Sequence, residues 1–108
     1  MIPELGPADL RIWQTDATRT PPALIDVREP WEFEYCRIEG SVPIPLGELA
    51  ARVDLVPRDR PLVMVCYHGN RSWHAAAMLL QCGFGEVYNL RGGVELWAAE
   101  VDPTMKRY

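Results

Sequence analysis

The chain has 108 residues, of which 48% are hydrophobic and 24% are charged, and its formal net charge is −4. This length and composition are typical of one globular domain, here residues 1–108, and exclude disordered, collagen-like and coiled-coil chains. The mildly acidic balance gives no support for a nucleic-acid partner, and no apolar run reaches the length that a membrane span needs. The N-terminal residues lack the basic and apolar regions of a signal peptide, so none is expected.

The chain contains few cysteines, and their number is odd. Cys36, Cys66 and Cys82 include no Cys-x-x-Cys pair, and His68 and His74 do not complete a metal-ligand cluster with them. We therefore expect neither a disulfide scaffold nor a metal site. Free thiols in this number favour a reducing compartment, the cytoplasm.

Short apolar runs and helical patterns alternate along the chain. Strands are predicted at 23–27, 62–66 and 86–90, with a brief strand within 38–44. Helices are predicted at 29–35, 46–53, 72–81 and 94–100. The runs at 23–27 and 62–66 are apolar throughout, as in parallel strands that are buried on both faces. The alternation predicts an α/β fold with a mainly parallel sheet and helices on both faces.

One strand-to-helix connection carries the residues that could take part in binding or catalysis. Cys66 ends a predicted strand and Ser72, a candidate helix cap, begins a predicted helix. A tight loop at this position turns its N–H groups inward and forms an anion-binding nest, to which the helix adds its N-terminal dipole. Gly69 suits the curled backbone, and Arg71 supplies a permanent positive charge. The loop residues are Tyr67, His68, Gly69, Asn70 and Arg71.

Cys66 is the candidate nucleophile of this connection. Backbone donors and positive charge favour the thiolate form of a cysteine at a helix N-terminus. The same cradle would hold a persulfide or the oxyanion of a substrate, which predicts nucleophilic catalysis by Cys66. A buried structural thiol at a strand end is the alternative. For Cys82, within an apolar helix, a place in the core is expected.

Four stretches in order resemble the single-domain rhodanese family of thiosulfate sulfurtransferase-like modules, over about residues 5–101. They are 24–29 (Leu-Ile-Asp-Val-Arg-Glu), 40–46 (Gly-Ser-Val-Pro-Ile-Pro-Leu), 65–72 (Val-Cys-Tyr-His-Gly-Asn-Arg-Ser) and 83–97, which includes Gly-Phe, Gly-Gly and Trp. The resemblance implies a small sheet of about five strands. It also implies that Asp26 and Arg28 are supporting residues near the site, although a purely structural ion pair is an equal alternative.

The length of the loop separates two kinds of chemistry. Four residues lie between Cys66 and Arg71, whereas related cell-cycle dual-specificity phosphatases carry five, in a wider loop that fits a phosphate. The resemblance therefore implies sulfur transfer rather than the reaction of a phosphatase or arsenate reductase. The Cys66 thiolate would take the outer sulfur of thiosulfate or a related small donor, and a thiol or cyanide would then accept it. Arg71 would support the loop or attract an anionic donor, and no cofactor is implied.

Several departures and alternatives remain open at this level. The second family block usually begins Gly-His-Ile and reads Cys36-Arg37-Ile38 here, so a role for that position is in doubt. We expect Arg37 in solvent, and Cys36 would receive sulfur only if it lies close to Cys66. For Trp73, a position that lines the pocket and a position that faces solvent are equally favoured. The alternative functions are a persulfide carrier, loaded from another donor or a protein partner, and a non-catalytic binding or regulatory module.

Overall fold

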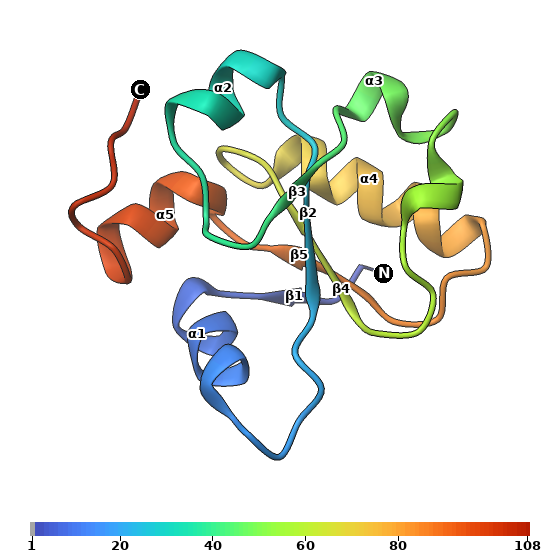
Figure 1. Ribbon diagram of the computed structural model, residues 1–108, viewed down its shortest axis with the longest axis horizontal. Coiled ribbons are helices and arrows are strands. Elements are labelled where there is room, and N and C mark those ends of the chain that lie inside the picture. The colour runs from blue at the N-terminus through green and yellow to red at the C-terminus, as the bar shows by residue number, and fades with distance from the viewer. Residues whose placement is uncertain (1) are drawn as a thin grey trace.

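A computed structural model describes residues 2–108 as a five-stranded parallel sheet with helices on both faces (Figure 1). The strand order is β1-β5-β4-β2-β3, and all four neighbouring pairs are parallel. This arrangement confirms the predicted fold class. The strands are β1 (Glu4–Leu5), β2 (Ala23–Asp26), β3 (Val42–Pro43), β4 (Leu62–Val65) and β5 (Val87–Leu90).

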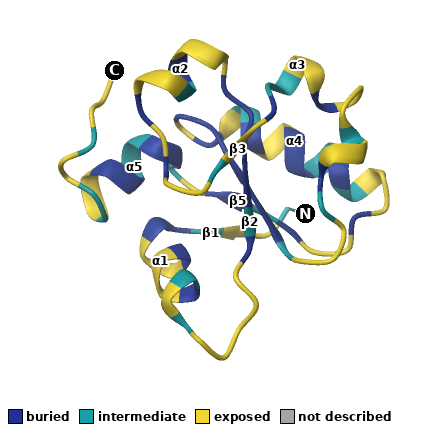
Figure 2. Ribbon diagram, viewed as in Figure 1, coloured by how far each residue is buried: buried dark blue, intermediate teal, exposed yellow. Residues whose placement is uncertain are grey.

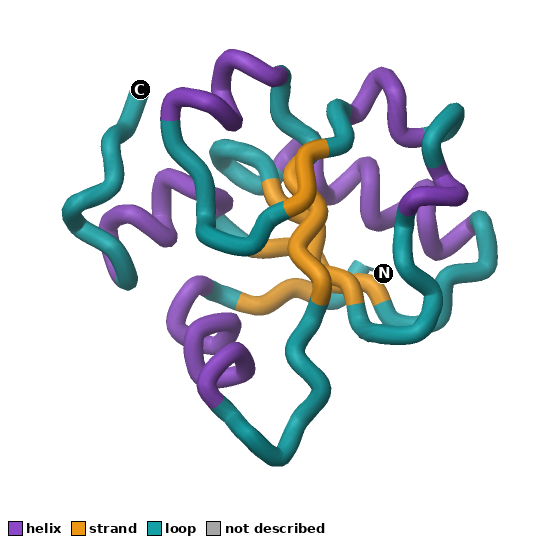
Figure 3. Tube along the Cα trace, in the orientation of Figure 1, coloured by secondary structure: helices purple, strands orange, loops and turns teal. Residues whose placement is uncertain are grey.

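Helices cover the sheet on both sides, as the tube in Figure 3 shows. One buried cluster joins the sheet to α1 (Pro7–Thr15) and α5 (Gly93–Glu100), and another joins it to α3 (Leu46–Leu49) and α4 (Asn70–Gln81). The remaining helical segments are α2 (Pro30–Tyr35) and the 3-10 turn η1 (Val53–Leu55). Within residues 2–108, no helix combines the length and the apolar character that crossing a bilayer requires.

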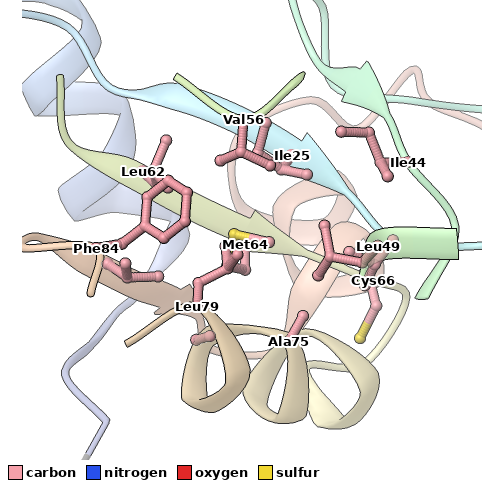
Figure 4. Close-up of a cluster of buried hydrophobic side chains, with 13 residues drawn as sticks. Ile25, Ile44, Leu49, Val56, Leu62, Met64, Cys66, Ala75, Leu79 and Phe84 are labelled. Carbon is pink, nitrogen blue, oxygen red and sulfur yellow. The ribbon is translucent and has the colours of Figure 1, made fainter. Parts of the chain in front are cut away.

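The central strand β4 supplies side chains to both clusters. Met64 and Cys66 lie in the α4 cluster, while Val63 and Val65 lie in the α5 cluster, because successive side chains of a strand point to opposite faces. All four residues of β4 are buried, which explains the unbroken apolar run in its sequence (Figure 2). Figure 4 shows Cys66 at the end of β4, pointing toward α4.

Two segments away from the β4–α4 connection differ from the sequence expectations. The helix predicted at 46–53 ends at Leu49 and is followed by a turn and η1. Leu49 and Val56 both enter the α4 cluster, one from each side of this turn. The elements β1 and α1 carried no sequence prediction. Strand β1 has only two residues, and it is held in the sheet by its pairing with β5.

Candidate active site

The predicted nucleophile lies at the carboxyl edge of the sheet, where β4 passes into α4. Helix α4 begins at Asn70, two residues earlier than predicted, and Gly69 is its N-cap with φ +104°. A side chain at Gly69 would also lie 3.3 Å from the backbone of Leu90 and Gly92. Glycine is therefore required for the loop to turn within so few residues.

Three donors converge on the sulfur of Cys66, which is 1% exposed. The backbone N–H of Gly69 lies 3.1 Å from Sγ, the N–H of Ser72 lies 3.3 Å away, and the Ser72 hydroxyl lies 3.2 Å away. Ser72 is therefore not the helix cap that its sequence position suggested. Because α4 starts at Asn70, Ser72 falls in the first turn and its hydroxyl points inward to the sulfur.

Helix α5 supports the loop from the other side. The N–H groups of Val94 and Glu95 donate to the carbonyls of Cys66 and Tyr67, at 2.9 and 3.1 Å. A Cβ at Gly93 would lie 2.3 Å from the Tyr67 oxygen, so only glycine permits this approach. The Gly-Gly pair at the start of α5 was visible in the sequence, but its contact with the loop was not.

Arg71 forms a bidentate ion pair with Glu32 of α2. Its Nη1 and Nη2 atoms lie 2.7 and 2.9 Å from the two carboxylate oxygens. The hydrogen bonds from Arg71, against the opposing effect of burial, lower the pKa of Glu32 to about 2. Of the two sequence alternatives for Arg71, these contacts fit support of the loop. Glu32 itself was not singled out, because nothing local marks its pairing with a residue 39 positions away.

The C-terminal segment returns from α5 toward α2 (Figure 1), and its last residue, Tyr108, contacts Tyr67 of the loop. The Tyr108 hydroxyl donates to Glu32 at 2.6 Å and accepts from Arg28 at 3.0 Å. Its ring stacks on Tyr67 with 4.0 Å between centroids, and its N–H donates to the Tyr67 hydroxyl at 2.9 Å. Burial and the bond to Glu32 raise the pKa of Tyr108. No local sequence pattern predicts this contact, since it depends on the path of the chain after α5.

Asp26 and Arg28 form a fully buried ion pair where β2 ends. Arg28 Nη2 lies 2.8 Å from Asp26 Oδ2, and both side chains are 0% exposed. The guanidinium also donates to the Cys36 carbonyl at 2.6 Å and to Tyr108. The pair thus ties the end of β2 to the segment that follows α2. These contacts give Asp26 and Arg28 a structural role.

The side chains of the other candidate residues are not among the hydrogen-bond donors to the Cys66 sulfur. His68 is largely exposed and pairs with Glu95 at 3.0 Å. Asn70 and Trp73 are exposed, and Trp73 contacts His74 edge-on. Arg37 faces solvent as expected.

The two remaining cysteines also differ in their surroundings. Cys82 is exposed at the end of α4, so its expected place in the core is wrong. Its neighbours Gln81 and Gly83 are exposed as well. Cys36 is buried in the α5 cluster, while Cys66 belongs to the α4 cluster on the opposite face of the sheet. This separation removes the support for direct sulfur passage between Cys36 and Cys66.

Comparison with known proteins agrees with this geometry. Residues 9–100 match the family described as the rhodanese-like domain. The chain belongs to this family. It is 47% identical over 74 residues to the thiosulfate sulfurtransferase GlpE of Pseudomonas syringae pv. syringae, a match that covers 68% of this chain and 70% of that protein.

Two solved structures show the same rhodanese-like arrangement. A rhodanese-related protein from Thermoplasma volcanium has a TM-score of 0.81 and 32% identity, with 92% of this chain and 93% of that chain covered. The reduced CoADR-RHD protein of Bacillus anthracis has a TM-score of 0.85 and 31% identity. That match covers 98% of this chain but only 18% of the Bacillus protein, so the domain corresponds to one part of a much longer chain.

Proposed function

We propose that this rhodanese-like domain is a sulfurtransferase that moves sulfane sulfur from thiosulfate to a thiophilic acceptor through a persulfide on Cys66. The observation that carries the proposal is the convergence of Gly69 N–H, Ser72 N–H and the Ser72 hydroxyl on one buried sulfur. The name of the Pseudomonas syringae relative supports thiosulfate as the donor. The three free cysteines support a reducing compartment, the cytoplasm.

The proposed reaction has two steps, each of which conserves charge and atoms. The Cys66 thiolate attacks the outer sulfur of thiosulfate, the S–S bond of thiosulfate breaks, and sulfite leaves with the bonding electron pair. Cyanide or a thiolate then attacks the terminal sulfur of the persulfide, and the Cys66 thiolate is released. The inward N–H groups of the loop hold the negative charge of the terminal sulfur in the intermediate.

Initial-rate kinetics test this sequence of steps. Thiocyanate formation measured against thiosulfate, at several fixed cyanide concentrations, is expected to give parallel double-reciprocal lines, because sulfite leaves before cyanide reacts. Lines that intersect would require a ternary complex and contradict the covalent intermediate. Absence of thiocyanate formation at every concentration would contradict thiosulfate as the donor.

The ion pair of Arg71 gives a second prediction. Glu32→Gln and Arg71→Ala are each expected to slow sulfur loading from thiosulfate by roughly 3- to 10-fold, and to cost about 1–3 kcal/mol of stability. Both substitutions remove the same support from the loop. Stopped-flow loading and chemical denaturation at neutral pH measure these effects. A Glu32→Gln protein that loads faster than wild type would show instead that a freed Arg71 attracts the anionic donor.

The same pair contributes to stability over a defined range of pH. The pKa of Glu32 is lowered from 4.5 to about 2 in the folded protein, so the contribution is fully present above about pH 4.5. It is lost as the pH falls toward 2, where the folded protein also binds the proton. Denaturation at neutral pH therefore measures the intact pair.

A further inference from the structure

A buried polar chain leads from the sulfur of Cys66 to a surface acid. The Ser72 hydroxyl lies 2.5 Å from Oδ1 of Asn89, a β5 residue that is 1% exposed. The amide nitrogen of Asn89 donates to Glu4 Oε2 at 2.7 Å and to the Gly69 carbonyl at 3.0 Å. The pairing of β1 with β5 sets Glu4 opposite Asn89. Neither Asn89 nor Glu4 was singled out by the sequence.

The partners of Asn89 determine how its amide group is oriented. The Gly69 carbonyl and the Glu4 carboxylate can only accept hydrogen bonds, so both must face the amide nitrogen. The oxygen of Asn89 then faces Ser72 and can only accept. Any hydrogen bond between the two residues is therefore donated by the Ser72 hydroxyl.

Ser72 has a single hydroxyl proton but two neighbours that can accept it. When Cys66 is a thiol, its S–H donates to the Ser72 oxygen and Ser72 donates to Asn89, so every group is satisfied. When Cys66 is a thiolate, sulfur and Asn89 compete for the same proton. The negative charge of Glu4 polarises the Asn89 amide and strengthens its oxygen as the competing acceptor.

We propose that Asn89, polarised by Glu4, is a positioning residue that draws the Ser72 hydroxyl proton away from Cys66 and thereby sets the pH at which Cys66 ionises. This inference rests on the proposed role of Cys66 as nucleophile. A thiolate that receives fewer hydrogen bonds is the stronger nucleophile, provided that enough of it exists at working pH. The two backbone donors, from Gly69 and Ser72, remain available to the sulfur in either state.

The other charged and titratable side chains around the loop have partners of their own. They come from α2, α4, α5, the loop and the end of β2: Glu32 with Arg71, His68 with Glu95, and Asp26 with Arg28. Glu4 is the acid that reaches Ser72 through a neutral amide. Its effect on Cys66 is therefore separable from theirs by substitution.

The test is a pH titration of the thiolate absorbance of Cys66, taken as the difference from Cys66→Ser. Asn89→Leu is expected to lower the midpoint by about one pH unit, because Ser72 can then donate to the sulfur without competition. The rate of sulfur loading above the midpoint is expected to fall by about 3-fold, as a better-stabilised thiolate attacks more slowly. A substitution that only disordered the hydrogen-bond donors around the sulfur would raise the midpoint instead.

A conservative variant keeps the test independent of folding. Glu4→Gln preserves the acceptor at an exposed position and removes only the charge, so a smaller downward shift is expected. Glu39→Gln, at another exposed acid, is the matched control and is expected to leave the midpoint unchanged.

The background of Ser72→Ala identifies the route of the effect. Both shifts are expected to vanish there, since they pass through the Ser72 hydroxyl. Shifts that persist without Ser72, upward shifts or no shift at all would overturn the inference. Because the titration needs no sulfur donor, a protein that shows these shifts but forms no thiocyanate would instead refute the proposed sulfur transfer.

Discussion

Replacement of Cys66 by serine is expected to reduce thiocyanate formation from thiosulfate and cyanide by at least about 1,000-fold. A serine hydroxyl in the same position is not ionised near neutral pH and cannot form a persulfide. The substitution is close in size, and the three donors around the position belong to other residues. Loss of activity without loss of the folded state, measured by steady-state kinetics and circular dichroism, would assign the nucleophile.

The other two cysteines provide the controls for this experiment. Cys82→Ser changes an exposed thiol at the end of α4 and is expected to retain full activity. Cys36→Ser tests a buried thiol on the other face of the sheet and is expected to retain sulfur transfer in the fraction that folds. Substantial turnover by Cys66→Ser would contradict the assignment, whatever the controls show.

Asp26→Asn is expected to destabilise the domain by about 3–5 kcal/mol, because it leaves the Arg28 guanidinium buried without its counter-charge. Both side chains are 0% exposed, and Asp26 receives three hydrogen bonds from the Arg28 side chain. For a domain of this size, the loss corresponds to a fall in melting temperature of more than about 10 °C. Calorimetry measures it directly.

A surface variant and a double variant make this experiment decisive. Asp59→Asn, at an exposed position, is expected to change stability by less than about 0.5 kcal/mol. Replacing Asp26 and Arg28 together by leucine and methionine is expected to cost less than Asp26→Asn alone, since no buried charge is then left unpaired. A cost below about 1 kcal/mol for Asp26→Asn would show that the buried pair is not a framework element.

Local patterns located the site, whereas long-range contacts completed it. The apolar run that ends at Cys66, the glycine of the loop and the helix that follows are neighbours in sequence, so their arrangement was predictable. The partners that hold this arrangement come from elsewhere. Glu32 lies 39 residues from Arg71, and Asn89 lies 17 residues from Ser72. No periodicity or spacing encodes such pairings.

The error at Ser72 illustrates the limit of local rules. Serine before an apolar helical pattern is a good cap candidate, and the helix was predicted to begin at residue 72. The positive φ of Gly69 allows α4 to begin at Asn70, which moves Ser72 into the first turn. The same hydroxyl then serves Cys66 and Asn89 rather than the end of the helix.

The most direct test of the proposed function is the intact mass of the protein after incubation with thiosulfate and removal of the donor by gel filtration. Wild type and Cys82→Ser are expected to gain the mass of one sulfur atom, which cyanide then removes. Cys66→Ser is expected to gain nothing. Absence of a gain in wild type, or the same gain in Cys66→Ser, would contradict a sulfur transfer that proceeds through a Cys66 persulfide.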